Sequence, residues 1–209
     1  FGNFAELVWD DQALSRPQVE LVAARVSAIN ECFYRTTSHV MQLRASSEAI
    51  GEEAKLDGAG GVGDGAVPHG GGLLAYAEAA ARGSEELPQA RQAVLAALGE
   101  AGFVLAAATV GIFSGLVRVA DSIGIPLDER TRQTSGAFRE DLGLNAFSGA
   151  RNTDLDRPEA AFGGCLHACS CSLGHRPVGP CFPLVSLGNG TWGGKVSPSA
   201  AGAFWGVLT

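Results

Sequence analysis

The sequence predicts an all-α protein, and three observations support this prediction. Residues 1–56 contain only two glycines and one proline, and residues 73–153 are rich in Ala, Leu and Val. Apolar residues recur at helical spacing in both stretches, and neither shows the alternating pattern of a strand. A chain of 209 residues, 46% hydrophobic and 18% charged, is long enough for one domain with a sizeable core.

The first expected helix has clear signals at both ends. Ser15 is a suitable N-cap, Pro17 lies in the first turn, and Gln18 follows Ser15 at capping-box spacing. An apolar stripe then runs along the helix, and Asn30 is a natural stop. The stripe consists of Leu21, Val22, Val26 and Ile29, with Arg25 at its edge.

Similar signals predict four more helices and a weaker one. Gly99 closes one of them, while Gly124 and Pro126 end the most apolar one. The weaker amphipathic stretch covers residues 129–143. The four expected helices are Cys32–Ser47, Leu73–Arg82, Pro88–Leu98 and Phe103–Ile123.

Two segments depart from this helical pattern. Residues 57–72 hold eight glycines in sixteen positions, which predicts a flexible loop inserted in the helical domain. Residues 154–209 are rich in glycine, proline and cysteine and have no sustained period, so we expect an irregular tail after a domain spanning 1–153. One hypothesis is that the cysteines and histidines of the tail bind a metal ion, but their spacing fits no standard zinc module. These candidate ligands are Cys165, His167, Cys169, Cys171, His175 and Cys181.

Charge and cysteine usage narrow the class of protein. The net charge of −7 argues against nucleic acid or an anionic membrane as the main partner. The apolar run Phe103–Val117 has 15 residues, which is too short to span a bilayer. Cys32 is the only cysteine in the first 153 residues, which favours a reduced, intracellular protein over a disulfide framework.

One helical face carries a group of reactive residue types. Cys32, Arg35 and His39 stand at i, i+3 and i+7, at and after the start of a helix. The helix dipole and the arginine both favour the thiolate, and a histidine exchanges protons near neutral pH. Glu20 reaches this face if the first two helices form a hairpin through Asn30. The alternative is that Cys32 is a small core residue and His39 an ordinary satisfied histidine.

The sequence around these residues resembles a known superfamily. The stretch from Leu14 to Ala45 resembles the carboxymuconolactone decarboxylase-like superfamily, and within it the alkylhydroperoxidase D-like, peroxidase-related branch. That branch has a glutamate twelve residues before a Cys-x-x-Cys motif, a tyrosine before the second cysteine, and a following Ser-His. Glu20, Cys32, Tyr34 and His39 match these positions. Arg118, Asp121 and the text "GIPLD" resemble its second signature, so the resemblance covers residues 4–130.

The resemblance implies an alkylhydroperoxidase D-like helical bundle and a thiol-dependent, peroxiredoxin-type oxidoreductase. Cys32 would be the redox thiol, His39 the proton shuttle, Glu20 its orienter and Arg35 a thiolate stabiliser. However, Arg35 stands where the branch has its second, peroxide-attacking cysteine, so a dithiol cycle within the motif is excluded and the activity is expected to be weakened. Two alternatives remain: a non-redox, decarboxylase-like acid-base enzyme that retains Glu20 and His39, and a catalytically silent member with a binding or structural role.

The partners follow from the same reading. We expect a small peroxide or carbonyl-type substrate, an external thiol as reductant, and no metal or other cofactor in the helical domain. A tail cysteine acting as the resolving partner of Cys32 is a further option. Family members assemble as trimers or larger rings, so the resemblance implies a homo-oligomer, to which the apolar helices would contribute surface.

Overall fold

The chain is all-helical where its structure is described. A computed structural model describes residues 13–156, which contain seven α-helices, two 3-10 helices and no strand, and this confirms the predicted fold class. These residues belong to the first of two compact units, Phe1–Glu159 and Ala160–Thr209. The expected tail beyond residue 156, with all of its candidate metal ligands, lies outside the described residues. The helices are α2 (Arg16–Ile29), α3 (Phe33–Ala49), α4 (Asp57–Gly60), α5 (Gly70–Arg82), α6 (Leu87–Ile123), α7 (Glu129–Thr134), α8 (Gly136–Asp141), η1 (Leu144–Ala146) and η2 (Ser148–Asn152).

Helices α2 and α3 form the predicted hairpin. Helix α2 begins as expected, because Gln18 Oε1 accepts the backbone N–H of Ser15 at 2.8 Å. It ends at Asn30, whose side-chain amide donates to the Val26 carbonyl at 2.8 Å. Glu31 then adopts a left-handed conformation, with φ 54°, and Cys32 becomes the N-cap of α3. The chain thus reverses within three residues, and α2 packs along α3 more extensively than any other pair of helices.

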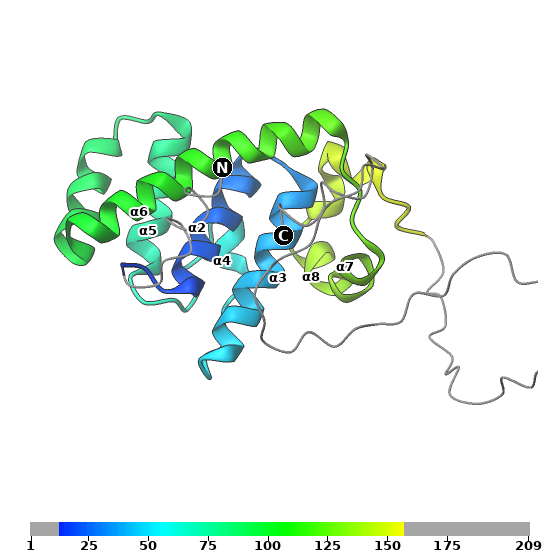
Figure 1. The fold of residues 1–209 in the computed structure, drawn as a ribbon, viewed down its shortest axis with the longest axis horizontal. Helices are drawn as coiled ribbons and strands as arrows, with labels where there is room; N and C mark the ends of the chain where they lie inside the picture. The colour runs from blue at the N-terminus through cyan, green and yellow to red at the C-terminus, as the bar shows by residue number, and fades with distance from the viewer. Residues whose placement is uncertain (1–12, 157–209) are drawn as a thin grey trace, which may run out of the picture. The chain divides into compact units, whose positions relative to one another are not determined.

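Helix α6 is the longest helix among the described residues and packs across three others. It packs against α2, α3 and α5, and Figure 1 shows it in green, crossing over them. The sequence predicted two helices here, and the reason is visible at Gly99, whose φ of 71° and ψ of −178° interrupt the helical path. Beyond this break, Leu105, Phe113 and Val117 are buried in the core. The break sets the direction in which the apolar second half of α6 lies over the hairpin.

The glycine-rich segment 57–72 differs from the expected unstructured loop. It contains the short helix α4, and α5 begins at Gly70, three residues before the predicted start. A Cβ on Gly58 would lie 2.8 Å from the Gly65 Cα, and one on Gly70 would lie 1.9 Å from the Asp64 carbonyl oxygen. Leu21 of α2 packs against all three glycines. The glycines here allow close backbone packing, and the prediction treated them only as a source of flexibility.

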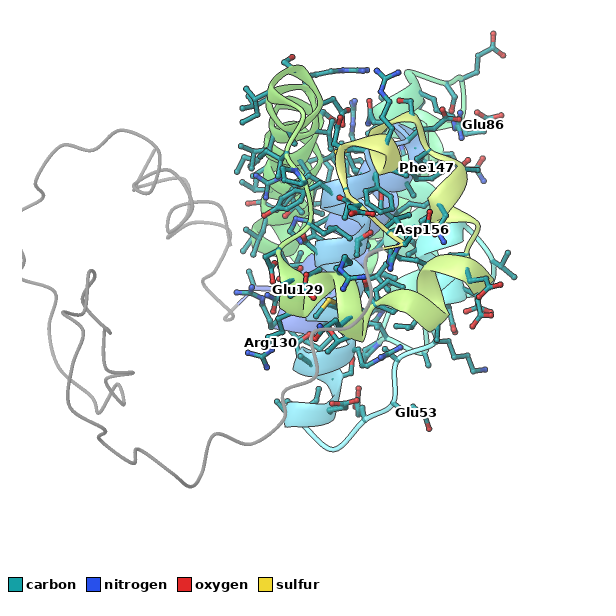
Figure 2. All side chains as sticks on the ribbon, turned by 90° about the vertical axis from the view of Figure 1, so that its right-hand side faces the viewer. Glu53, Glu86, Glu129, Arg130, Phe147 and Asp156 are labelled. Atoms are coloured by element: carbon teal, nitrogen blue, oxygen red, sulfur yellow. The ribbon has the colours of Figure 1, made fainter. Side chains whose placement is uncertain are left out.

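The segment after α6 wraps back onto the hairpin. The single weak helix expected over residues 129–143 is divided into α7 and α8 at Ser135, which ends one helix and begins the other. The 3-10 helices η1 and η2 follow, and both contact α3. Figure 2 shows this segment, with Phe147 labelled, in front of the pale blue ribbons of the hairpin. This end of the fold therefore closes over the N-terminal part of α3.

One face of α6 remains exposed. Leu95, Val104, Val119 and Ile123 keep between 40% and 59% of their surface accessible. By length and composition alone, α6 would suffice to cross a membrane, which is a test that core helices of soluble proteins also pass. The helix is longer than the 15-residue run from which the sequence argument excluded a span. That this surface meets a second copy of the chain stays a prediction.

The break in α6 gives a test of the fold. Gly99→Ala is expected to lower the free energy of unfolding by about 1–3 kcal/mol, because this backbone conformation is nearly exclusive to glycine. The cost is conformational, since a Cβ at Gly99 would meet nothing within 4 Å. Urea unfolding followed by circular dichroism measures it.

The matched control for this substitution lies in the same helix. Gly111 also has open space at its Cβ position but keeps helical angles, so Gly111→Ala is expected to stabilise the protein by up to about 1 kcal/mol. Equal effects of the two substitutions would contradict the assignment of the break to Gly99.

Candidate functional site

A buried carboxylate and a histidine join α2 to α3. Glu20 is fully buried, and its Oε2 lies 2.7 Å from His39 Nδ1. Its other oxygen lies 2.6 Å from Nε of Arg16, whose side chain reaches solvent. The contact between Glu20 and His39 that the hairpin predicted is therefore present. Because Nδ1 faces a carboxylate, the neutral ring carries its proton there, and the lone pair falls on Nε2.

The second ring nitrogen of His39 lies in an apolar setting. Only 6% of His39 is exposed, and Nε2 has no hydrogen-bond partner among residues 13–156. Phe113 of α6 meets the imidazole edge-on, with ring centroids 4.4 Å apart. Buried polar atoms in proteins are normally paired. The unpaired basic nitrogen of this oriented imidazole is therefore a candidate for proton transfer to a ligand.

The thiol of Cys32 differs from the expected activated thiolate. It is fully buried, receives a hydrogen bond from the backbone N–H of Arg35, and is hydrogen-bonded to the side chain of Asp121. Burial and the Asp121 carboxylate raise its pKa from 9.0 to about 12, and the N–H and guanidinium of Arg35 offset only part of this rise. The prediction of a lowered pKa is therefore wrong, because desolvation and a nearby acid outweigh the helix terminus.

Arg35 and Tyr34 are both in the core, on different sides of α3. Arg35 is 2% exposed, precedes His39 by one turn, and therefore lies on the same side of the helix. Burial lowers the pKa of its guanidinium, while Tyr34 and Cys32 raise it. Tyr34 lies about 140° around the helix from His39. Its ring contacts the guanidinium of Arg35 at 5.6 Å, and burial raises the pKa of its hydroxyl.

The end of α6 meets the turn before α3. Arg118 donates to the side-chain oxygen of Asn30 at 2.9 Å, and Asp121 reaches the Cys32 thiol. The sequence pointed to Arg118 and Asp121 only as parts of a second motif and gave neither a partner. The two motifs, 88 residues apart, thus form one structural unit around the start of α3. Asp121 is the residue that the sequence argument missed as a determinant of the thiol.

The arrangement favours proton transfer. Glu20 and His39 form an oriented acid-base pair, whereas Cys32 is held as a neutral thiol. Among residues 13–156, no three His, Cys, Asp or Glu side chains gather in a way that would hold a metal ion. The catalytic roles predicted for Glu20, Cys32, Tyr34, Arg35 and His39 stay predictions.

The raised pKa of Cys32 predicts a loss of stability at alkaline pH. A thiol that is protonated in the folded protein but ionised in the unfolded chain contributes stability fully below about pH 9. This contribution is lost as the pH rises toward about 12. The free energy of unfolding of the wild type should therefore fall more steeply above pH 9 than that of Cys32→Ala. The difference in slope should approach about 1.4 kcal/mol per pH unit.

Urea titrations at several pH values between 8 and 11 measure these slopes. Tyr76 also has a raised pKa, which does not involve Cys32, so its contribution is equal in both proteins and cancels in the comparison. The pKa of Tyr34 is raised mainly by burial, and this part cancels too, whereas the smaller part that comes from Cys32 is removed together with the thiol. Identical slopes would mean that the fold does not hold the thiol in its protonated form.

Comparison with known proteins finds a family match for the helical hairpin but not for the whole chain. No curated protein and no solved structure matches the chain. The range that matches a protein family contains α2, α3 and with them Glu20, Cys32, Arg35 and His39, whereas the second motif lies outside it. Residues 1–54, with both helices that supply the site, match the carboxymuconolactone decarboxylase family.

Proposed function

We propose that this protein is an acid-base enzyme in which the Glu20–His39 pair transfers a proton to or from a small carbonyl-type substrate. One observation carries the proposal: Nδ1 of His39 is held by a buried carboxylate, while Nε2 is left without a partner among the described residues. The match of residues 1–54 to the carboxymuconolactone decarboxylase family supports the choice of a lactone acid as substrate.

Decarboxylation of a lactone acid requires one proton transfer, which the Glu20–His39 pair can supply. When a lactone acid loses CO₂, the bond between the carboxylate and the ring carbon breaks. Its electron pair passes into the conjugated lactone carbonyl. One proton must then reach a ring carbon, and His39 delivers it from Nε2 after the neutral ring has taken up a proton there; the delivery returns the ring to its neutral form. Glu20 keeps the ring oriented and stabilises the imidazolium form. A positioned acid of this kind contributes about 10²–10⁴-fold in rate.

Arg35 adds a fixed charge to this site. Its buried guanidinium lies one turn from His39 on the same side of α3. A positive charge in a low-dielectric setting favours an anionic substrate and the enolate that follows loss of CO₂. Arg35 stands where the resembled branch has its second cysteine, so it excludes a dithiol cycle within the motif, and its charge suits the acid-base chemistry.

The thiol-dependent peroxidase is the second candidate. It is favoured by the backbone N–H of Arg35, which donates to the Cys32 sulfur at the start of α3. Burial and Asp121 oppose it, because they raise the pKa of the thiol to about 12 and so keep it protonated at pH 7. Peroxide reacts with the thiolate, so this route requires Cys32 to be exposed and Asp121 to move away.

Two substitutions separate these candidates. His39→Gln is expected to lower kcat for decarboxylation of carboxymuconolactone by at least about 100-fold, because the proton donor is lost. Cys32→Ala is expected to retain turnover within a few fold. Loss of the lactone's ultraviolet absorbance follows the reaction, and consumption of hydrogen peroxide with dithiothreitol is measured on the same proteins.

His69→Ala is the control, because this exposed histidine precedes α5 and belongs to neither of the helices that carry the pair. The acid-base proposal fails if His39→Gln turns over the lactone like the wild type. Peroxide consumption that depends on Cys32 would establish the second candidate instead.

A further inference from the structure

Several buried polar atoms of α3 have no partner among residues 13–156. They include Oγ1 of Thr36, Oγ1 of Thr37, Nε2 of His39 and Oγ of Ser47, which lies two turns beyond His39. Both threonines are fully buried. A buried hydroxyl without a hydrogen bond costs about 1–3 kcal/mol, a cost that valine, with nearly the same shape, would avoid. Each of these hydroxyls therefore needs an explanation other than packing.

Several other hydroxyls in the helices of this protein are satisfied locally. Ser27, Thr109 and Ser122 each donate to the carbonyl four residues earlier, at 2.7, 2.8 and 2.6 Å. Ser38, in α3 itself, does the same at 2.9 Å. This bond is the usual fate of a helical Ser or Thr that lacks another partner. Thr36 and Thr37 do not make it, so their hydroxyls remain available to another group.

Helix geometry separates the two threonines. Thr36 precedes His39 by three residues, so their side chains are neighbours on one face, with Cβ atoms about 5–6 Å apart. Thr37 precedes His39 by two residues and lies about 200° around the helix from it. Only Thr36 therefore shares a face with the unpartnered Nε2, while Thr37 has the same burial and chemistry on another face.

We propose that Thr36 Oγ1 and His39 Nε2 form one two-point binding site for a lactone acid, in which the Thr36 hydroxyl donates to a carbonyl or carboxylate oxygen while His39 transfers the proton. This inference rests on the proposed function. A single hydroxyl satisfied by the substrate explains why α3 keeps Thr36 buried at a cost. This hydrogen bond also orients the substrate, because the oxygen that accepts it must lie on the same side of α3 as His39.

Steady-state kinetics on carboxymuconolactone test the inference. Thr36→Val should lower kcat/KM about tenfold, the value of one hydrogen bond. Thr36→Ser, which keeps the hydroxyl, should stay within threefold of the wild type, and Thr37→Val should remain unchanged. Both valine variants should unfold at or above the wild-type temperature, because each removes an unpaired buried hydroxyl.

A binding measurement without turnover complements the kinetics. In the His39→Gln background, calorimetric titration with carboxymuconolactone should show about tenfold weaker binding when Thr36→Val is added and no change when Thr37→Val is added. The inference is overturned if Thr36→Val and Thr37→Val behave alike in both experiments, or if the lactone is not bound. The proposed function fails separately, when His39→Gln itself retains turnover.

Discussion

The contact between Glu20 and His39 is the constraint on which the hairpin and its chemistry depend. A carboxylate taken fully out of water costs several kcal/mol unless it is paired, and here it is paired on both sides, with Arg16 and His39. Removal of one partner from such a pair typically costs about 3–5 kcal/mol. A sliding of α3 along α2 by one residue would break the pair, so the cost of an unpaired charge fixes the relative register of the two helices.

The same packing gives His39 and Cys32, both on or at the start of α3, different chemical properties. His39 is held with one nitrogen engaged and the other available, while Cys32, at the start of the helix, is held between Asp121 and the backbone of Arg35. An acid beside a thiol opposes the helix terminus, and the acid and the burial prevail. The helix therefore presents a basic nitrogen and a neutral sulfur, although a cysteine at a helix terminus alone favours the thiolate.

Features that depend on local sequence were predictable, and features that depend on distant packing were not. The capping box at Ser15, the stop at Asn30 and the break at Gly99 follow from backbone preferences within a few residues, and all three are present. The pairing of Glu20 with His39 needed only the assumption of a hairpin. The thiol pKa was mispredicted because it depends on Asp121, 89 positions further along the chain, and on a burial that no spacing rule reports. The unpaired hydroxyl of Thr36 was missed because only an inventory of donors and acceptors reveals it.

The packing of glycines around Leu21 has a consequence for how this chain tolerates change. A side chain at Gly58 or Gly70 would displace the backbone of Gly65 or Asp64, and one at Gly65, whose φ is 71°, would meet the Leu21 side chain. Leu21 is the residue next to Glu20. At these three positions, a segment with the composition of a flexible linker is therefore expected to tolerate substitution as poorly as a hydrophobic core does. In a library of random variants, substitutions at these three glycines should disappear from the functional population about as quickly as substitutions at the charged residues of the site, whereas Gly72, with open space at the Cβ position, should tolerate more change.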